Sequence, residues 1–335
     1  MVPSFMRDKK SVLLVGGAGY VGSATTEQLI ERGYHAVVLD NLYQGHQDAI
    51  HPAAEFIKGS ISDEEFLDNL FGSREFFGAM DFAGETLIEF SMTNPNRYFQ
   101  ANVVDGLKLL NAMVKHGVER FVFSSTSAIY GEPQEIPMPE THQKYPGNSY
   151  GESKLIFEQI LKWYHRIHNI RSVCFRYFNA AGASERFGED HRPETHLIPL
   201  ILQVALGQRN EIKIFGDDYP TKDGTCVRDY THVYDLAQAH IAGLENADSL
   251  GHDAFNLGNG DGYTVQEVIQ AARDVTGHAI PATIVPRRAG DVSRMVASSE
   301  KAKSVLGWNP KFPKIHQILE TAWKWHLQNH KGYER

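Results

Sequence analysis

Tyr150 and Lys154 are the residues of this sequence whose types and spacing point most directly to acid–base chemistry, and Ser124-Ser125-Thr126 precedes them. On a helix, two residues four apart lie one turn apart on the same face. A free phenol has a pKa of about 10, and bringing that pKa near neutrality takes about 4 kcal/mol. A fixed cation, a buried cofactor charge and a hydrogen bond from Thr126 could together supply this. The pair alone is weak evidence, because the same spacing occurs by chance on many amphipathic helices.

The elements around this pair alternate between short apolar runs and amphipathic stretches. Strands are predicted at residues 12–15, 35–39, 55–57, 76–82, 121–124 and 171–177. Helices are predicted at about residues 19–32, 94–115 and 150–168. This alternation predicts an α/β fold, a Rossmann-like doubly wound parallel sheet with helices on both faces.

The pattern changes after about residue 179. Long loops rich in Gly, Pro, Asp and His, at residues 180–199 and 216–228, alternate with predicted helices near 197–206, 233–244, 264–275 and 315–326. Loops of this length in a compact chain tend to be functional. We therefore predict a dinucleotide-binding domain over residues 1–180, with one strand and helix returning from about 230–260. Residues 181–335 are predicted to form mainly a smaller C-terminal α/β substrate-binding domain.

A glycine-rich turn follows the first predicted strand and opens the first predicted helix. Residues 16–22 read GGAGYVG and contain the fingerprint Gly17-x-Gly19-x-x-Gly22. Such glycines allow a tight turn, close approach of a pyrophosphate to the backbone, and close helix–sheet packing. Asp40 follows the second strand about 20 residues on, where a carboxylate binds the ribose hydroxyls. Because Asp40 would repel a 2′-phosphate, the predicted cofactor is NAD rather than NADP.

With a dinucleotide site in place, the set of Thr126, Tyr150 and Lys154 resembles the catalytic residues of the short-chain dehydrogenase/reductase superfamily. Three further segments are similar to its extended branch: FRYFNAAGA at 175–183, FGDDYPTKDGTCVRDYTHV at 215–233, and PRRAGD at 286–291. Together they resemble the UDP-glucose 4-epimerase family of nucleotide-sugar epimerases. The resemblance extends from about Ser11 to Pro310, nearly the whole chain.

This resemblance implies a reaction, namely the NAD-dependent 4-epimerisation of a UDP-hexose through a transient 4-keto sugar. Tyr150 would take the proton from the sugar 4-hydroxyl, and Thr126 would hydrogen-bond the reacting oxygen. Lys154 would hold the nicotinamide ribose and lower the pKa of Tyr150. Hydride would leave C4 and return to the other face of the sugar, so that no net oxidation occurs.

The resemblance also implies two sets of binding residues. The expected NAD contacts are Gly16, Gly19, Tyr20, Val21, Asp40, Asn41, Ser60, Ile61, Phe82, Ala83, Asn102, Ser124, Tyr150, Lys154 and Tyr177. The expected UDP-sugar contacts are Thr126, Tyr150, Asn179, Leu197, Phe215, Arg228, Arg288 and Asp291. The two arginines suit a diphosphate because the planar guanidinium matches phosphate oxygens. Asp291 would accept hydrogen bonds from the nucleotide ribose, and Leu197 and Phe215 would line the uracil pocket.

The sequence departs from the family pattern on the cofactor side. It has Ser60 where Asp is usual after the third strand, and DFAG at 81–84 where His usually comes first. Thr86 stands at a position where a lysine often contacts the cofactor, and residues 85–93 are unlike the usual stretch. These changes lead us to expect weaker NAD binding than in the commonest epimerases. Ser127-Ala128 follows Thr126 where the dehydratases of the superfamily carry Asp-Glu, which disfavours dehydration.

The preferred substrate stays open at this stage. Met295 stands at the position that helps decide whether an N-acetyl group fits, and methionine is adaptable. The alternatives are therefore 4-epimerisation of a UDP-N-acetylhexosamine, a UDP-pentose or a UDP-uronate. A different class of protein, a non-catalytic NAD-binding scaffold or sensor, is disfavoured by the complete set of Thr126, Tyr150 and Lys154.

Bulk properties narrow the class of protein. The formal net charge of −8 argues against a nucleic-acid partner. The sequence contains no apolar run of membrane-spanning length and no signal-peptide core at its start. Two cysteines, Cys174 and Cys226, fit a reducing compartment, and we expect a cytoplasmic protein.

The histidines at 191, 196, 232 and 240 do not form a recognised ligand spacing, so no metal is predicted. Apolar residues on several faces of the 94–115 and 153–168 helices, with the family resemblance, imply a homodimer.

Overall fold

The computed structural model describes residues 9–288 and 290–333. The chain forms two compact units. The first contains the described residues up to 131, together with residues 143–176 and 237–255. The second contains residues 132–142, 177–236 and those from 256 onward. The sequence prediction divided the chain near residue 180 with a returning segment near 230–260, and it did not separate residues 132–142 from the first domain.

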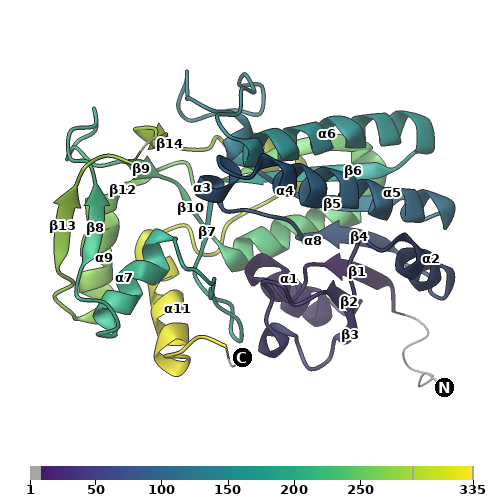
Figure 1. The fold of residues 1–335 in the computed structure, drawn as a ribbon, viewed down its shortest axis with the longest axis horizontal. Coiled ribbons are helices and arrows are strands. Elements are labelled where there is room, and N and C mark those ends of the chain that lie inside the picture. Colours follow the sequence, from purple (N-terminus) through teal and green to yellow (C-terminus); the bar gives the residue numbers. More distant parts are fainter. Residues whose placement is uncertain (1–8, 289, 334–335) are drawn as a thin grey trace. The chain divides into compact units, whose positions relative to one another are not determined.

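A seven-stranded sheet forms the centre of the first unit (Figure 1). Its strands, in spatial order, are β11 (His252–Leu257), β6 (Arg171–Tyr177), β5 (Arg120–Thr126), β4 (Gly78–Asp81), β1 (Ser11–Val15), β2 (His35–Asp40) and β3 (Glu55–Lys58). The pairings from β3 through β2, β1 and β4 to β5 are parallel. The strand order reverses between β1 and β4. In doubly wound sheets ligands bind at the carboxyl ends of the strands beside such a reversal.

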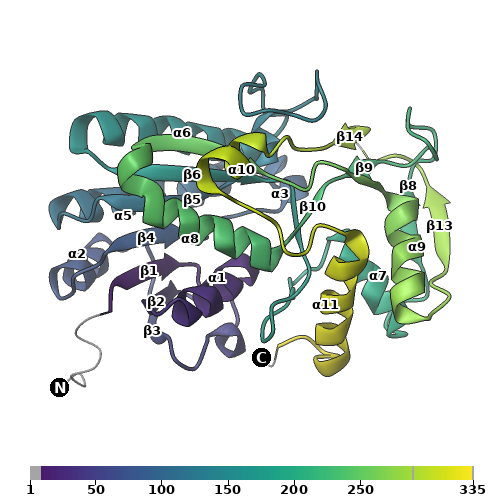
Figure 2. The same ribbon diagram turned by 180° about the vertical axis from the view of Figure 1, so that it is seen from behind.

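Helices cover both faces of this sheet (Figures 1 and 2). They are α1 (Tyr20–Glu31), α2 (Glu64–Gly72), α3 (Ile88–Ser91), α4 (Pro95–Phe99), α5 (Asp105–Lys115), α6 (Ser149–His168) and α8 (Val233–Leu250). Short 3₁₀ turns lie at η2 (Gln47–Ala49) and η4 (Ser127–Ile129). Apolar residues of α2, α5 and α6 pack with those of β1, β2 and β5 in one buried cluster. The sheet, the flanking helices and this core confirm the predicted Rossmann-like α/β fold.

The helix predicted at residues 94–115 is interrupted. Its middle is the π-helical turn η3 (Gln100–Val104), which separates α4 from α5. A π-helical turn inserts one extra residue into the helical ladder and often occurs at a functional site. The sequence prediction also missed α2, which begins where the Asp63 side chain accepts a hydrogen bond from the backbone N–H of Phe66 at 3.0 Å.

The second unit contains three small sheets and a helical layer. The sheets pair β7 (Asn179–Ala181) with β10 (Tyr230–His232), β8 (Ile212–Phe215) with β13 (Ala282–Val285), and β9 (Val227–Arg228) with both β12 (Tyr263–Thr264) and β14 (Arg294–Met295). The helices are α7 (Leu197–Ala205), α9 (Val265–Thr276), α10 (Glu300–Leu306) and α11 (Ile315–Gln328). Apolar faces of α7, α9 and α11 form the core of this unit. Within the described part of the chain, every helix is too short or too polar to span a bilayer.

Candidate functional site

The glycine turn between β1 and α1 has the geometry that a pyrophosphate requires. Gly16 has φ +74°, and a Cβ there would lie 2.7 Å from the backbone nitrogen of Ala83. A Cβ on Gly22 would lie 2.3 Å from the carbonyl oxygen of Gly16. Gly19 caps α1 without a side-chain hydrogen bond, so the first backbone N–H groups of this helix are available to an anion. Tyr20 and Val21, both predicted cofactor contacts, form the first turn of α1.

Asp40 ends β2 and lies beside the same turn. Its two carboxylate oxygens accept hydrogen bonds from the backbone N–H groups of Ala18 at 3.0 Å and Leu42 at 2.8 Å. Burial raises the pKa of the Asp40 carboxyl, and these two hydrogen bonds oppose the rise. Each oxygen keeps acceptor capacity for a ribose hydroxyl. Next to it, the Asn41 side chain accepts from the backbone N–H of Tyr43 at 2.8 Å.

Ser60 and Asp81, which depart from the family pattern, each form a hydrogen bond with a residue two positions further along the chain. Ser60 follows β3, and its hydroxyl lies 2.8 Å from the hydroxyl of Ser62. Ile61, a predicted cofactor contact, packs against the core of the first unit. Asp81 ends β4 and is 4% exposed. It accepts a hydrogen bond from the backbone N–H of Ala83 at 3.0 Å, which shapes the turn after β4.

Asn102 connects the turn after β4 to helix α6. Its amide oxygen accepts from the backbone N–H of Glu85 at 2.8 Å, and its amide nitrogen donates to the Glu85 carbonyl at 3.1 Å and to the Ser153 hydroxyl at 2.9 Å. A Cβ on Gly84, which has φ +141°, would lie 2.5 Å from the same amide oxygen. Asn102 belongs to η3, so the π-helical turn places this predicted cofactor contact against the edge of the sheet.

Thr126 and Tyr150 meet through a side-chain hydrogen bond. Thr126 ends β5, and its hydroxyl also accepts from the backbone N–H of Ala128 at 3.1 Å. The first turn of α6 lies against this segment, because a Cβ on Gly151 would come within 2.4 Å of the Ala128 carbonyl oxygen. Asn148 caps the helix by accepting from the backbone N–H of Gly151 at 2.8 Å. The predicted triad residues Thr126 and Tyr150 are thus brought together within the first unit.

Lys154 lies one turn further along α6 and is 3% exposed. Its ammonium donates to the carbonyl of Ser124, a predicted cofactor contact, at 3.0 Å. Burial lowers the pKa of Lys154 to about 8, and the carboxylate of Asp81 opposes that fall. Burial likewise raises the pKa of Asp81 to about 6, against the effect of Lys154. The two groups therefore stabilise each other's charged form.

The pKa of Tyr150 moves opposite to the direction that a base at neutral pH requires. Burial raises it, the hydrogen bond from Thr126 lowers it, and the neighbouring Tyr98 raises it further. The ring of Tyr98 lies edge-on to Tyr150 with centroids 6.5 Å apart. The sequence suggested three contributions that could lower the pKa of Tyr150: a fixed cation, a cofactor charge and a hydrogen bond from Thr126. In the protein itself, the Thr126 hydrogen bond is the one that lowers this pKa.

A buried ion pair behind the triad was missed in the sequence analysis. Arg176 of β6 binds Glu158 of α6 through two hydrogen bonds, of 2.9 and 2.5 Å. The hydroxyl of Ser125 donates to Glu158 at 2.6 Å, and Arg176 donates to the hydroxyl of Tyr130 at 3.0 Å. This network ties α6 to β5 and β6. Glu158 continues the four-residue spacing of Tyr150 and Lys154, and that spacing was the signal in the sequence.

The charged residues predicted to bind substrate gather within the second unit, in a group that we call the arginine cluster: Arg228, Arg288 and Asp291. Asp291 lies 3.5 Å from Arg228 and makes two hydrogen bonds of 3.1 Å with Arg288. The guanidinium of Arg288 lies 5.2 Å from the ring centroid of Phe215, another predicted contact. Ala289, part of the PRRAGD motif, lies outside the described residues.

The remaining predicted substrate contacts, Asn179 and Leu197, lie at the starts of β7 and α7. Arg228 of β9 is in register with Met295 of β14. Asn179 of β7 donates to the backbone carbonyl of Asp229 at 2.8 Å. Asp229 itself is fully buried and accepts three backbone N–H groups, so its carboxylate is not paired with Arg228. Leu197 begins α7.

Two predicted cofactor contacts stand at strand ends. Tyr177 is the last residue of β6. Phe82 directly follows β4, and its ring lies 4.9 Å from that of His240.

Comparison with known proteins agrees with this geometry. A family model described as the NAD dependent epimerase/dehydratase family matches residues 12–258. The UDP-glucose 4-epimerase of Halalkalibacterium halodurans is 48% identical over 326 residues, which cover 96% of this chain and 97% of that protein. A crystal structure of a UDP-glucose 4-epimerase, 49% identical, covers 97% of this chain and 100% of its own, with a TM-score of 0.95.

A second solved structure carries ligands. It is the UDP-glucose 4-epimerase of Bifidobacterium longum in complex with NAD+ and UDP, 35% identical, with a TM-score of 0.91 over 97% of this chain and all of that chain. The family match covers most of the sequence, and the relatives align over nearly its full length. The chain belongs to the NAD-dependent epimerase/dehydratase family.

Proposed function

We propose that this protein catalyses the NAD-dependent 4-epimerisation of a UDP-hexose and interconverts UDP-glucose and UDP-galactose. The observation that carries the proposal is the hydrogen-bonded pair of Thr126 and Tyr150, with Lys154 one turn along α6. This set stands at the carboxyl edge of a sheet whose first turn is built for a dinucleotide. Relatives that are nearly half identical over the full chain are UDP-glucose 4-epimerases, which supports the choice of substrate.

The residues of the first unit fit NAD. The glycine turn has no room for side chains at Gly16 and Gly22, and the open N-terminus of α1 suits the pyrophosphate. Asp40 accepts the adenosine ribose hydroxyls, and its negative charge disfavours a 2′-phosphate. Lys154 donates to the nicotinamide ribose. Bound NAD supplies a reversible hydride acceptor for C4 of the sugar and a positive charge beside Tyr150.

Tyr150 acts as the general base. It takes the proton of the 4-hydroxyl as hydride leaves C4, which converts the sugar into the 4-keto form. Thr126 would hydrogen-bond the reacting oxygen beside Tyr150. After the sugar turns in the pocket, hydride returns to its other face and Tyr150 gives the proton back to the oxygen. Every atom and electron removed is returned, so the net reaction is an isomerisation.

The second unit binds the nucleotide part of the substrate. Arg228 and Arg288 donate to the diphosphate, and Asp291 accepts from the uridine ribose. In the free protein these residues are paired with one another, so a diphosphate would exchange with Asp291 for the two guanidinium groups. Asn179 donates near the diphosphate, while Leu197 and Phe215 line the uracil pocket.

The sugar itself is the open element of the proposal. Met295 is in register with Arg228, and its unbranched side chain can adapt to more than one substituent. A UDP-N-acetylhexosamine, UDP-pentose or UDP-uronate is therefore the runner-up substrate. A non-catalytic scaffold of the same fold is disfavoured because all three catalytic positions are occupied and partnered.

Incubation with a panel of UDP-sugars and NAD, followed by proton NMR, tests the function. We expect interconversion of UDP-glucose and UDP-galactose to an equilibrium mixture without accumulation of NADH. Conversion of only another UDP-sugar would replace the substrate and keep the chemistry. Binding of NAD without turnover of any UDP-sugar would leave the scaffold as the function.

Weaker NAD binding than in the commonest epimerases is part of the proposal. Ser60 is engaged with Ser62 rather than providing a carboxylate for the cofactor, and Thr86 lacks the positive charge of a lysine. We expect protein purified without added cofactor to hold NAD in only part of the molecules. Full occupancy after extensive dialysis, measured by absorbance and mass spectrometry, would refute this.

A homodimer and a cytoplasmic location complete the proposal. Trp163 and Ile167 of α6 expose 59% and 67% of their surface, and Val104 of the adjoining η3 exposes 41%. A second copy packed against α5 and α6 would cover these apolar side chains. Light scattering at micromolar concentration should give twice the monomer mass. Cys174 and Cys226 are both free thiols, which suits a reducing compartment.

A further inference from the structure

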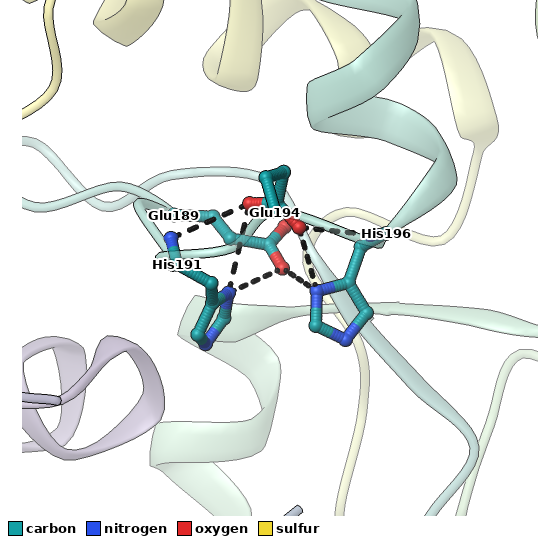
Figure 3. A group of neighbouring side chains, drawn as sticks. All are labelled: Glu189, His191, Glu194 and His196. Atoms are coloured by element: carbon teal, nitrogen blue, oxygen red, sulfur yellow. Dashed lines mark hydrogen bonds and ion pairs between the residues drawn. The ribbon is translucent and has the colours of Figure 1, made fainter. Parts of the chain in front are cut away.

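Four side chains with metal-binding groups meet in the loop between β7 and α7. They are Glu189, His191, Glu194 and His196, which we call the Glu–His cluster (Figure 3). One ligand atom from each of the four lies within 4.8 Å of the other three. The epimerisation proposed above uses none of them. The spacing of the two histidines alone does not reveal the site, because Glu189 and Glu194 complete it.

The distances in the Glu–His cluster match those around a tetrahedral zinc ion. Nδ1 of His191 lies 3.2 Å from Glu189 and 3.7 Å from Glu194, and Nδ1 of His196 lies 2.9 Å from Glu189 and 3.0 Å from Glu194. Zinc holds nitrogen and oxygen donors at about 2.0–2.1 Å, so neighbouring donors in a tetrahedron stand about 3.3 Å apart. The four ligand atoms lie within 4.8 Å of one another, so the donors that are furthest apart would move closer together on binding an ion.

The alternative explanation for the Glu–His cluster is a set of salt bridges without a metal. Each Nδ1 carries at most one proton, yet each faces both carboxylates, as the dashed lines in Figure 3 show. Each imidazole is thus placed between two carboxylates, which is the arrangement that a metal ion bound to all four groups would produce. The carboxylates raise the pKa of His191 to about 9 and that of His196 to about 10, so an ion must displace two protons.

Backbone groups hold one carboxylate of the cluster in its orientation. Glu194 accepts hydrogen bonds from the backbone N–H groups of Thr195 and His196, both at 2.8 Å, and of His191 at 3.4 Å. Outer hydrogen bonds of this kind orient metal ligands and tune affinity. Asp190, the acid between Glu189 and His191, is bound by Arg192 at 2.7 Å and does not enter the cluster.

Charges from other elements also reach the cluster. His326 of α11 interacts with Glu189 and Glu194, although burial lowers its own pKa. Tyr230 of β10 interacts with Glu189. Glu189 is 5% exposed, while the His196 side chain keeps 48% exposed. The cluster thus has a buried floor and one accessible side through which an ion can enter.

We propose that Glu189, His191, Glu194 and His196 bind one Zn²⁺ ion. Two imidazoles with two carboxylates favour zinc, because Mg²⁺ and Ca²⁺ prefer sites built from oxygen alone. The ion would tie residues 189–196 together immediately before Leu197, the first residue of α7, and so fix the start of that helix. The role is structural, and the site does not depend on the reaction that the protein catalyses.

Metal titration of the full-length protein tests this inference. After dialysis against EDTA and removal of the chelator, ZnCl₂ should bind at one equivalent per chain in calorimetry and raise the melting temperature. MgCl₂ at the same concentrations should do neither. CoCl₂ should give the intense visible absorption of tetrahedral cobalt. Binding at less than a tenth of an equivalent, or cobalt spectra typical of six oxygen ligands, would overturn the proposal.

Single substitutions locate the ion. His196→Gln and Glu194→Gln should each weaken Zn²⁺ binding by at least about tenfold, since even outer-shell changes cost about 10–100-fold. His316→Gln is the matched control, because His316 is a half-exposed histidine of the same unit that pairs with Asp274. Circular dichroism without metal checks that each variant folds, and His196→Gln is the milder change because that side chain is half exposed. Wild-type affinity in both cluster variants would refute the site.

Discussion

Thr126 and Lys154 in the first unit are 7% and 3% exposed, whereas Arg288 in the second unit leaves 55% of its side chain in solvent. The reacting groups are fixed by strand ends, a capped helix and a buried ion pair. Arg288 of the arginine cluster is held by Asp291 at 3.1 Å, and Arg228 lies 3.5 Å from Asp291 while donating to the backbone carbonyls of Val227 and Val292 at 3.0 and 2.9 Å. Burial therefore positions the groups that transfer protons. Exchangeable ion pairs position the groups that must release one another when a diphosphate arrives.

This contrast has a physical reason. A proton transfer requires a fixed geometry, and a position that is wrong by about 1 Å can cost about a hundredfold in rate. A charged ligand instead needs guanidinium groups that are kept near the binding position but remain open to exchange. If the contrast is correct, changes in the first unit should affect rate and stability, and changes in the arginine cluster should affect binding.

The largest effect is expected from Tyr150→Phe. Removing the general base should lower kcat by about 10³–10⁴-fold, while KM stays within about threefold, because proton transfer contributes about 10²–10⁴. Tyr164→Phe makes the same change on the same helix, at a hydroxyl that binds Asn111, and should leave kcat unchanged. Turnover by Tyr150→Phe near the wild-type rate would remove Tyr150 as the base.

A large loss of stability is expected from Glu158→Gln. The variant leaves the buried guanidinium of Arg176 without its counter-charge, and breaking a buried pair costs about 3–5 kcal/mol. Urea unfolding should show a loss of about 3 kcal/mol or more. Glu152→Gln, near the start of the same helix, should change stability by less than about 0.5 kcal/mol. Equal stability of the two variants would show that the ion pair does not hold α6 in place.

Substitutions in the arginine cluster should raise the KM for the UDP-sugar. Arg228→Gln removes a charge-assisted contact to the diphosphate, and hydrogen bonds to charged groups are worth about 1.5–3 kcal/mol. We expect KM for the UDP-sugar to rise by about 10–100-fold and the melting temperature to change little. Arg209→Gln is the control, because Arg209 lies in the same unit and its side chain donates to the side chain of Gln203 at the end of α7. A fall in kcat at constant KM would place Arg228 with the reacting groups instead.

The same contrast explains how far the sequence could predict the molecule. The alternation of strands and helices depends on residues close together in the chain, and the fold predicted from it is confirmed. The glycine turn lies between β1 and α1, and Asp40 ends β2, where the sequence placed them. Thr126 ends one strand, and Tyr150 and Lys154 lie in the first two turns of the next helix. Their spacing in the sequence was enough to propose that they act together. Local patterns were therefore enough to predict the fold, and they are the basis on which the catalytic residues are proposed.

The rest depends on residues that meet only after folding. Glu158 and Arg176 come from α6 and β6, and only the tertiary packing of these elements makes them a pair. The helical stretch predicted over residues 94–115 contains a π-helical turn, and Asn102 within that turn binds the backbone of Glu85 after β4. The Glu–His cluster was missed for another reason. Its four residues are close in sequence, but they alternate carboxylate with imidazole, and a search restricted to histidines does not find that pattern.

A smaller, pH-dependent effect tests whether the buried charges of the first unit support the reaction. The carboxylate of Asp81 supports the charge of Lys154, whose pKa burial lowers to about 8. Asp81→Asn removes that support, so the pKa of Lys154 should fall further. The ammonium form is lost as pH rises through this pKa, and the alkaline limb of the kcat profile should therefore move to lower pH. Asp105→Asn, at an aspartate paired with Lys108, should leave the limb in place. A limb that stays fixed in a folded Asp81→Asn protein would mean that Lys154 does not act through its charge.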